Sequence, residues 1–300
     1  MPIAACALAP SPTYESLFGM AASPTAPAPT HHPGPLVIAT QTMTSFHSTL
    51  LNNDRPIDIF LPPGYDSATD HYPVLYANDG QDMPALGMKA SLEMLYARRA
   101  IEPIIVVAIH ATEARLQEYG TASAANSRGL GAQAADYTRF LLEEVMPYVN
   151  GRYRLRGDPP HTVIMGASLG GLSAFDIAWS HPELFGKVGV FSGSFWWHTD
   201  DAGAQAIQDS RIMHRVVRQS SKREGMRFWF EAGLHDETDD RDGNGVIDAV
   251  QDISELMDAL AAKGYSRETD MAYVQVDGWH NQATWARALP DFLLWAFSSP

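Results

Sequence analysis

The chain contains six short runs of nearly consecutive apolar residues, separated by segments with helical periodicity. The runs occupy residues 74–76, 104–109, 163–165, 188–191, 228–230 and 273–276. Runs of this kind, bounded by Gly, Pro or Asp, are typical of strands that are buried on both faces. Because strands and helices alternate, the sequence predicts a mostly parallel sheet with helices covering both of its faces.

The predicted helices lie between these runs and after them. The clearest pattern covers 132–149, and further patterns cover 85–99, 170–180, 203–219, 250–263 and 281–297. Two stretches of alternating polar and apolar residues, 43–51 and 55–62, come before all of them and predict an antiparallel hairpin. The fold class is therefore α/β, with an antiparallel N-terminal hairpin beside a parallel sheet. In such sheets ligands bind at the carboxyl ends of the strands.

Two segments of different composition divide the chain. Residues 21–35, AASPTAPAPTHHPGP, offer almost nothing to bury, so residues 1–36 are predicted to be a disordered arm rich in Ala and Pro. No second linker follows, and 37–300 is predicted to be a single α/β domain. The N-terminus lacks the basic and apolar regions of a signal peptide, which favours a cytoplasmic location and leaves secretion as the alternative.

Charge and cysteine content exclude several classes of function. The formal net charge is −14, so nucleic acid and anionic membrane surfaces are not expected as partners. No apolar run approaches the roughly 18 residues that a membrane span needs. The single cysteine, Cys6, cannot form an intrachain disulfide or a cysteine metal cluster. The oligomeric state stays open.

A G-x-S-x-G motif lies between a predicted strand and a predicted helix. Gly166-Ala167-Ser168-Leu169-Gly170 directly follows the run at 163–165 and directly precedes the helix at 170–180. In that setting the motif is typical of a nucleophile elbow, the sharp turn that exposes the serine hydroxyl of α/β-hydrolases. An ordinary Gly-rich turn with a helix-capping serine is the alternative. Ser168 is therefore the predicted nucleophile.

The partners of such a serine follow it in the order acid, then histidine. The acid is expected just past a later strand, and 227–232 is such a strand. Asp236 is the predicted acid, with Glu237 as the alternative. His280 is then the only histidine that remains downstream, and it is the predicted base. Five histidines follow the serine in all: His181, His198, His214, His235 and His280.

An oxyanion hole needs two N–H groups that face the tetrahedral oxygen. One donor is expected from the backbone of Leu169, the residue after the nucleophile. The other is expected from the loop after 74–77, where the backbone of Gln81 is the predicted donor. The same loop is also consistent with a simple Asp-Gly turn.

Several sequence blocks in this order resemble the putative esterase family of the α/β-hydrolases. The blocks are YPVLYANDGQD (72–82), Arg115 with Glu118-Tyr119, MGASLGGLSAF (165–175), HPELFGKVGVFSGSFWW (181–197), FEAGLHDETDDRDGNGVID (230–248) and GWHNQATWARALPDFLLWAF (278–297). The family includes esterase D, feruloyl esterases, the antigen 85 mycolyltransferases and enterochelin-esterase-like proteins. The resemblance covers about 55–298. It implies the α/β-hydrolase fold in one catalytic domain, a Ser168-Asp236-His280 triad and no required cofactor.

The resemblance stops at the level of subfamily. Esterase D proteins carry a His-Gly segment and a cysteine where this chain has Asp79-Gly80. The acyl-channel segment of antigen 85 and the extra N-terminal β domain of enterochelin esterases have no counterpart here. Arg115 and Glu118 are interpreted as a structural ion pair, with a place at the border of the site as the alternative.

The residues together predict a carboxylic-ester hydrolase. It would act through an acyl-serine intermediate on a small-molecule ester with a short-to-medium or aromatic acyl group. One alternative is an acyltransferase to a sugar or alcohol with the same triad, and another is a non-catalytic binding module with this fold. Four aromatic residues are candidates for substrate binding or, equally, for core packing: Phe195, Trp196, Trp197 and Trp279.

An acidic loop over 240–248 matches the start of a calcium-binding loop. Its candidate ligands are Asp240, Asp242, Asn244 and Asp248. The position of the usual bidentate Glu is occupied by Gln251, which weakens the match. The competing interpretation is a helix start, with Asp248 as the cap and Gln251 completing a capping box.

Overall fold

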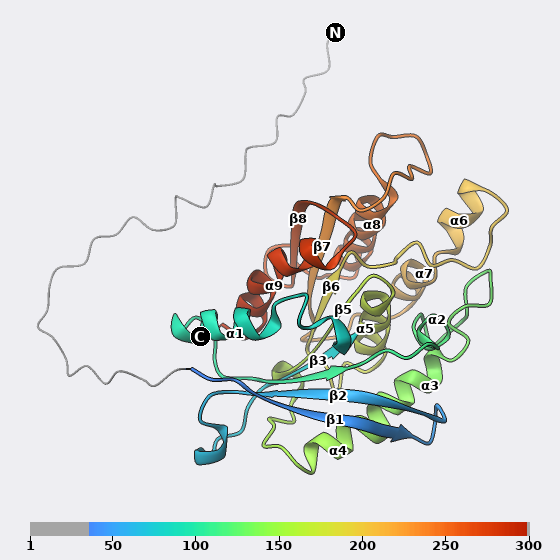
Figure 1. The fold of residues 1–300 in the computed structure, drawn as a ribbon. Helices are drawn as coiled ribbons and strands as arrows, with labels where there is room; N and C mark the ends of the chain where they lie inside the picture. The colour runs from blue at the N-terminus through green and yellow to red at the C-terminus, as the bar shows by residue number, and fades with distance from the viewer. Residues whose placement is uncertain (1–35, 299–300) are drawn as a thin grey trace, which may run out of the picture. The chain divides into compact units, whose positions relative to one another are not determined.

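An eight-stranded sheet runs through the computed structural model, which describes residues 36–298 (Figure 1). The spatial order of its strands is β1-β2-β4-β3-β5-β6-β7-β8. The first three strands in that order pair antiparallel, and every later pair is parallel. The predicted hairpin and mostly parallel sheet are confirmed. The strands are β1 (Ala39–Ser48), β2 (Asn53–Leu61), β3 (Val74–Asn78), β4 (Ile105–Ile109), β5 (Thr162–Ala167), β6 (Lys187–Phe191), β7 (Arg227–His235) and β8 (Met271–Trp279).

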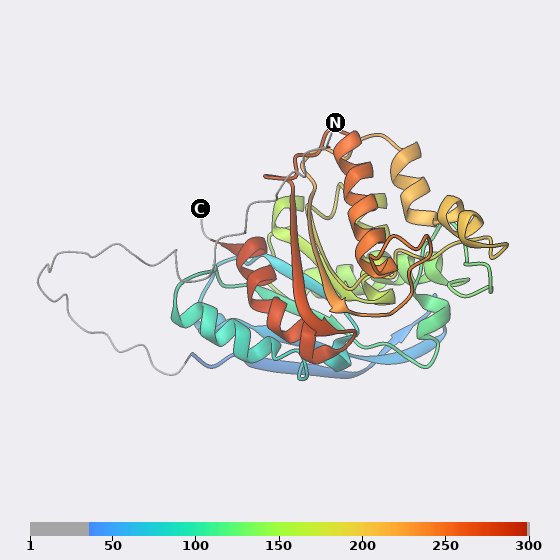
Figure 2. The same cartoon turned by 90° about the horizontal axis from the view of Figure 1, so that it is seen from above.

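Helices cover both faces of this sheet. α1 and α9 lie together on one face and pack on a core that includes Leu92 and Phe292 (Figure 2). The opposite face carries α3, α5, α7 and α8, with Phe175 of α5 at the centre of a second core. The helices are α1 (Met88–Ala97), α2 (Arg115–Glu118), α3 (Ala134–Arg139), α4 (Met146–Asn150), α5 (Leu169–Ser180), α6 (Ala204–Ser210), α7 (Ile212–Gln219), α8 (Asp248–Ala262) and α9 (Gln282–Phe297).

Two predicted helices are less regular than their sequence patterns suggest. The helix at 132–149 contains a π-helical stretch, Phe140–Val145, before α4. Pro147 follows that stretch and has no N–H to donate, which interrupts the regular ladder. The helix at 203–219 breaks at Arg211, which has an extended backbone (ψ 118°). The buried Arg211 guanidinium pairs with Asp252 and Glu255 of α8, a contact that the sequence pattern does not reveal.

The carboxyl ends of the parallel strands place the candidate residues at one edge of the sheet. The loops after β3, β5, β6, β7 and β8 carry, in that order, Gln81, Ser168, Trp196, Asp236 and His280. The predicted N-terminal arm, residues 1–36, lies outside the described residues except for Leu36, which packs against the core. None of the helices described in 36–298 has both the length and the apolar character that crossing a membrane requires.

Candidate active site

Ser168 occupies the sharp turn between β5 and α5. Its backbone has φ 55° and ψ −125°, a conformation that is uncommon for a residue with a side chain. Glycines make this turn sterically possible. A Cβ at Gly166 would lie 2.2 Å from the carbonyl oxygen of Gly170, so only glycine allows strand and helix to approach this closely. The turn therefore has the geometry of a nucleophile elbow.

The hydroxyl of Ser168 faces an imidazole. His280 Nε2 lies 2.9 Å from Ser168 Oγ, a hydrogen-bond distance. His280 directly follows β8, and Asn281 caps α9 by accepting a hydrogen bond from the N–H of Thr284 at 3.0 Å. The His280 ring also packs edge-on against Trp285, with centroids 5.3 Å apart. The strand end, the helix cap and the aromatic contact together hold the imidazole over the serine.

Asp236 lies on the far side of that imidazole. Its Oδ2 is 3.8 Å from His280 Nδ1, and its side chain is 1% exposed. The carboxylate folds back over Gly233, whose N–H donates to Oδ2 at 3.1 Å. The distance to His280 is longer than a hydrogen bond, and catalytic hydrogen bonds in ligand-free sites are often long.

Glu237, the alternative acid, points to a different place. It lines a surface cavity next to Asp239 rather than facing His280. Burial raises the pKa of Glu237 to about 7, and the negative charges of Asp248 and Asp239 add to the rise. Of the two adjacent carboxyl groups, Asp236 is the one that the fold brings to the imidazole.

The loop after β3 is tied directly to the elbow. The Asn78 side-chain amide donates to the carbonyl of Gly170 at 2.8 Å. A Cβ at Gly170 would lie 2.6 Å from Asp79 Oδ2, so this loop and the elbow are in close contact. Leu169 is the first residue of α5, and its N–H therefore has no acceptor within the helix. Gln81 lies in the short 3₁₀ turn Gly80–Asp82 of the same loop.

An ion pair holds the loop after β3 in its unusual conformation. Asp79 has a left-handed backbone (φ 56°), and its carboxylate is nearly buried. Arg115 donates to both Asp79 oxygens, at 2.7 and 2.8 Å. Gln81 binds the same carboxylate through its amide at 3.2 Å. The sequence contains no local signal for this contact, because the two partners are 36 residues apart and belong to different elements.

The predicted pairing of Arg115 with Glu118 is wrong. Glu118 instead forms a buried ion pair with Arg55 of β2, with 2.8 Å between Arg55 Nη2 and Glu118 Oε1. In the short helix α2 the two side chains leave in different directions, one toward the loop after β3 and the other toward the first strands.

Two of the four candidate aromatic residues belong to the core. Phe195 is 0% exposed and packs edge-on against Phe175, with centroids 5.5 Å apart. Trp197 is 2% exposed and lies against Gly120 and Gly131. They are therefore not walls of an open site, because their rings fill the space beneath the loop after β6. Trp196 and Trp279, 38% and 63% exposed, remain accessible.

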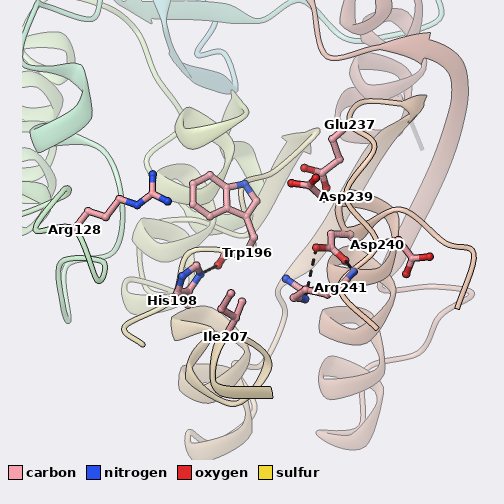
Figure 3. Close-up of a pocket in the computed structure, with 9 residues that line it drawn as sticks. Arg128, Trp196, His198, Ile207, Glu237, Asp239, Asp240 and Arg241 are labelled. Atoms are coloured by element: carbon pink, nitrogen blue, oxygen red, sulfur yellow. Dashed lines mark hydrogen bonds and ion pairs between the residues drawn. The ribbon is translucent and has the colours of Figure 1, made fainter. Parts of the chain in front are cut away.

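A cavity of about 510 Å³ opens beside these loops (Figure 3). Trp196 lies between Arg128 on one side and the carboxylates of Glu237 and Asp239 on the other. None of the three candidate triad residues lines this cavity, although Glu237, which does, follows Asp236 directly in the chain. Ser194, two residues before Trp196, has its hydroxyl 3.4 Å from that of Ser168. The residues that line the cavity are Arg128, Trp196, His198, Ile207, Glu237, Asp239, Asp240, Arg241 and Asp248.

The acidic loop does not assemble the predicted calcium ligands. The Asp240 oxygens accept hydrogen bonds from the N–H groups of Asn244 and Gly245, at 3.1 and 2.8 Å. Asp242 accepts a hydrogen bond from Gln251 at 2.9 Å. Within residues 36–298, no group of three or more His, Cys, Asp or Glu side chains is arranged to hold a metal ion. The structure therefore does not show a calcium site at the four proposed ligands.

The competing interpretation is correct that a helix begins at this point and wrong about how the helix is capped. α8 begins at Asp248, and the residue at its N-cap is Ile247. The Asp248 carboxylate turns back to accept the N–H of Arg241 at 2.9 Å instead of capping the helix. The Arg241 guanidinium lies 3.6 Å away and compensates the charge of Asp248. Arg241, a basic residue within the loop, thus neutralises the carboxylate that was expected to cap the helix or to bind a cation.

Comparison with known proteins identifies related sequences and folds. The model of a family described as putative esterase matches residues 48–296. The iron(III) enterobactin esterase of Escherichia coli K12 is 26% identical over 251 residues, which is 82% of this chain and 54% of that protein. An endo-1,4-beta-xylanase/feruloyl esterase of Xylanibacter ruminicola is 26% identical over 55% of this chain and 23% of its own length. This chain thus spans about half of the enterobactin esterase that it matches.

Solved structures with this fold include two esterases. A ferulic acid esterase superposes with a TM-score of 0.67 at 20% identity, covering 87% of this chain and 98% of its own. The enterobactin esterase of Shigella flexneri, solved in the presence of enterobactin, superposes with a TM-score of 0.66 at 23% identity. That match covers 87% of this chain and 58% of the other. At these identities the likeness supports the α/β-hydrolase fold.

Proposed function

Because this chain belongs to the putative esterase family, we propose that it is a carboxylic-ester hydrolase that uses Ser168 as its nucleophile. The observation that carries the proposal is the contact between Ser168 Oγ and His280 Nε2, 2.9 Å long, at a turn with the backbone of a nucleophile elbow. The family relatives named enterobactin esterase and feruloyl esterase support the same reaction class.

The proposed reaction uses the site residues in sequence. His280 Nε2 takes the proton of Ser168 as the hydroxyl oxygen attacks the ester carbonyl. The backbone N–H groups of Leu169 and Gln81 would face the oxygen that becomes negative. His280 then donates its proton to the departing alcohol, which leaves an acyl-Ser168. Water attacks this intermediate by the same route. Buried Asp236 would stabilise the imidazolium that forms in each half of the reaction.

No metal or organic cofactor has a role in this scheme. The proton moves only between Ser168, His280, the alcohol and water. Each bond change is an acyl transfer between oxygen atoms, which needs no redox partner.

The Arg115–Asp79 pair is proposed to position the Gln81 N–H. We expect Arg115→Met to lower kcat by roughly 10-fold to 100-fold while KM changes little, because a displaced oxyanion donor weakens only transition-state binding. Steady-state kinetics on a p-nitrophenyl ester measure both constants. Arg139→Met is the matched control, since Arg139 pairs with exposed Glu143 away from the site. An unchanged kcat in Arg115→Met would show that the Arg115–Asp79 pair does not position an oxyanion donor.

The cavity lined by Trp196 and Glu237 is proposed to bind part of the ester. Its wall combines the Trp196 ring, able to stack on a flat group, with hydrogen-bonding side chains of both charges. Such a lining suits a substrate with a planar or polar portion, and this supports aromatic acyl esters among the candidates. Trp279 precedes His280 in the chain and is the most exposed of the large apolar residues described.

A panel of esters tests the proposed reaction. The panel holds p-nitrophenyl esters from acetate to octanoate and an aromatic cinnamate-type ester, each measured with and without an added alcohol. We expect turnover of at least one ester and labelling of Ser168 by a fluorophosphonate, because the elbow serine is activated. Product that accumulates as a new ester when alcohol is present would instead indicate an acyltransferase. No turnover and no labelling would indicate a binding module.

The same panel of esters distinguishes binding in the cavity from an effect on the chemical step. In Trp196→Ala we expect KM to rise about 10-fold for the aromatic ester, since stacking on an aromatic side chain contributes about 1 kcal/mol or more. The acetate ester is the internal control and should keep its KM, because its acyl group is too small to reach the cavity. Equal effects on both esters would place the binding of the acyl group elsewhere.

A further inference from the structure

A second carboxyl group lies buried directly behind Asp236. Glu231 belongs to β7, and its side chain is 0% exposed. Residues 231 and 233 share one face of the strand, because successive side chains alternate between faces. Gly233 has no side chain, and the Asp236 carboxylate occupies that space: a Cβ at Gly233 would lie 2.3 Å from Asp236 Oδ1. The two carboxyl groups are therefore neighbours on the same face of β7.

Each of the two carboxyl groups has one oxygen with a partner and one without. Glu231 Oε2 accepts from the Ser192 hydroxyl at 3.3 Å, and Asp236 Oδ2 accepts from the Gly233 N–H. Glu231 Oε1 and Asp236 Oδ1 are both buried and have no hydrogen-bond partner among residues 36–298. Two ionised carboxylates only accept hydrogen bonds and repel each other. One proton between them would give both oxygens a partner.

The surroundings favour a proton on Glu231. The pKa of Glu231 is raised to about 8, mainly by burial and in addition by the negative charge of Asp236, while the Ser192 hydrogen bond opposes the rise. Tyr273 of β8 is paired with Phe230 and packs on the opposite face of the sheet; burial raises its pKa, and the charges of Glu231 and Asp236 add to that rise. Trp285 of α9 is neutral and donates to Ser192 at 2.9 Å. His280 approaches only from the Asp236 side.

We propose that Glu231 and Asp236 share one proton, with Glu231 Oε1 donating a hydrogen bond to Asp236 Oδ1. Glu231 is then a positioning residue for the reaction proposed above, on which this inference rests. Its hydrogen bond occupies the oxygen of Asp236 that faces away from His280 and leaves Oδ2 for the imidazole. The pair carries a single negative charge. When the proton is lost, two charges share one buried site, and Asp236 Oδ1 loses the donor that fixes the position of the carboxylate.

Two substitutions of Glu231 distinguish the effect of its hydrogen-bond donor from the effect of its ionisation. In Glu231→Gln the amide oxygen can accept from Ser192 while the amide N–H donates permanently to Asp236. In Glu231→Leu the space stays filled but the donor is gone. We expect Glu231→Gln to keep kcat at pH 7 within about threefold, and Glu231→Leu to lower it about 10-fold or more with little change in KM.

The pH profile is the readout that a purely structural role would not change. In the wild-type protein we expect kcat/KM to fall as pH rises through about 8, where Glu231 loses its proton. Glu231→Gln cannot lose that proton and should keep its activity to higher pH. Asp176→Asn is the matched control: burial raises the pKa of this α5 carboxyl to about 6, and its recorded partner is the Ala122 N–H rather than Asp236. In the Asp176→Asn control, kcat/KM should fall at alkaline pH as it does in the wild type.

Stability gives a second readout that needs no turnover. The folded-state pKa of Glu231 lies above its ordinary value, so folding binds a proton at this group, and the stability that Glu231 contributes falls as pH rises from about 4.5 to about 8. The melting temperature of Glu231→Gln should therefore exceed that of the wild type by a margin that grows from pH 5 to pH 9. The infrared carbonyl absorption of protonated carboxylic acids at pH 7 should lose the contribution of Glu231 in the same variant, while the contribution of Glu237 stays.

Several results would overturn the inference. The first is a fall of kcat/KM at alkaline pH in Glu231→Gln that matches the wild type. The second is an equal loss of activity in the Gln and Leu variants. The third is an infrared absorption of protonated carboxyl groups that does not change in Glu231→Gln. If Glu231→Leu does not fold, the pH profile and the infrared band of the other two proteins still decide. Failure of the proposed function is distinct, because it would appear as absent ester turnover and absent Ser168 labelling in the wild type.

Discussion

Replacing Ser168 by alanine should lower kcat by about 10⁴-fold to 10⁶-fold, because the members of a catalytic triad act as one unit. The hydroxyl lies 2.9 Å from His280 Nε2, and without it no atom at the elbow can form the acyl intermediate. His280→Ala is expected to lose a comparable factor, since no other imidazole contacts Ser168 among the described residues. Activity is measured with the best ester of the panel, and folding is monitored by the melting temperature.

Ser194→Ala is the matched control for the serine variant. The Ser194 hydroxyl lies 3.4 Å from that of Ser168 and is nearly buried, so the control removes a neighbouring hydroxyl of the same kind. We expect it to keep kcat within about 10-fold, because a hydrogen bond between neutral groups contributes about 1 kcal/mol. If Ser168→Ala retained most of the activity while Ser194→Ala lost it, the nucleophile would have been assigned to the wrong residue.

Asp236→Asn should lower kcat by about 10³-fold to 10⁴-fold with folding intact. The buried carboxylate lies 3.8 Å from His280 Nδ1 and is the negative charge that faces the imidazolium. The amide would remove that charge and leave the imidazole without an acceptor that selects its tautomer. Asn is nearly isosteric and can still accept from the Gly233 N–H, so the melting temperature should change little. Steady-state kinetics and thermal unfolding on the same samples test both statements.

Glu237→Gln is the control, because it changes the adjacent carboxyl group in the same way. Glu237 lines the cavity and does not face His280, so we expect a loss of less than about 10-fold, mostly in KM. A larger loss of kcat in Glu237→Gln than in Asp236→Asn would identify Glu237 as the acid.

Local patterns in the sequence were enough for the fold and for the centre of the site. Apolar runs alternating with helical patterns predicted the mostly parallel sheet, because burial on both faces requires such runs. The glycines around Ser168 predicted the turn, since Gly166 and Gly170 are needed wherever strand and helix approach so closely. The chain order then pointed to Asp236 and His280, and the fold brings both toward Ser168.

The aromatic and acidic segments required the structure. In Phe195-Trp196-Trp197 the composition is uniform, yet only Trp196 is accessible, because the loop turns the flanking rings toward Phe175 and the α2–α3 region. In the acidic loop, Arg241 compensates Asp248 and backbone N–H groups satisfy Asp240, which a spacing motif does not reveal.

Tertiary structure alone decided which distant groups support the site. In the sequence, Glu231 is a single polar residue in the strand RFWFEA, and nothing local indicates a role for it. The structure shows that it is buried beside Asp236 and is therefore a neighbour of the candidate triad. The Arg115–Asp79 pair likewise joins elements that are distant in the chain. Sequence periodicity reports local burial because it repeats over a few residues. The protonation and position of a buried group depend instead on every charge that the fold places around it, and those charges come from separate strands.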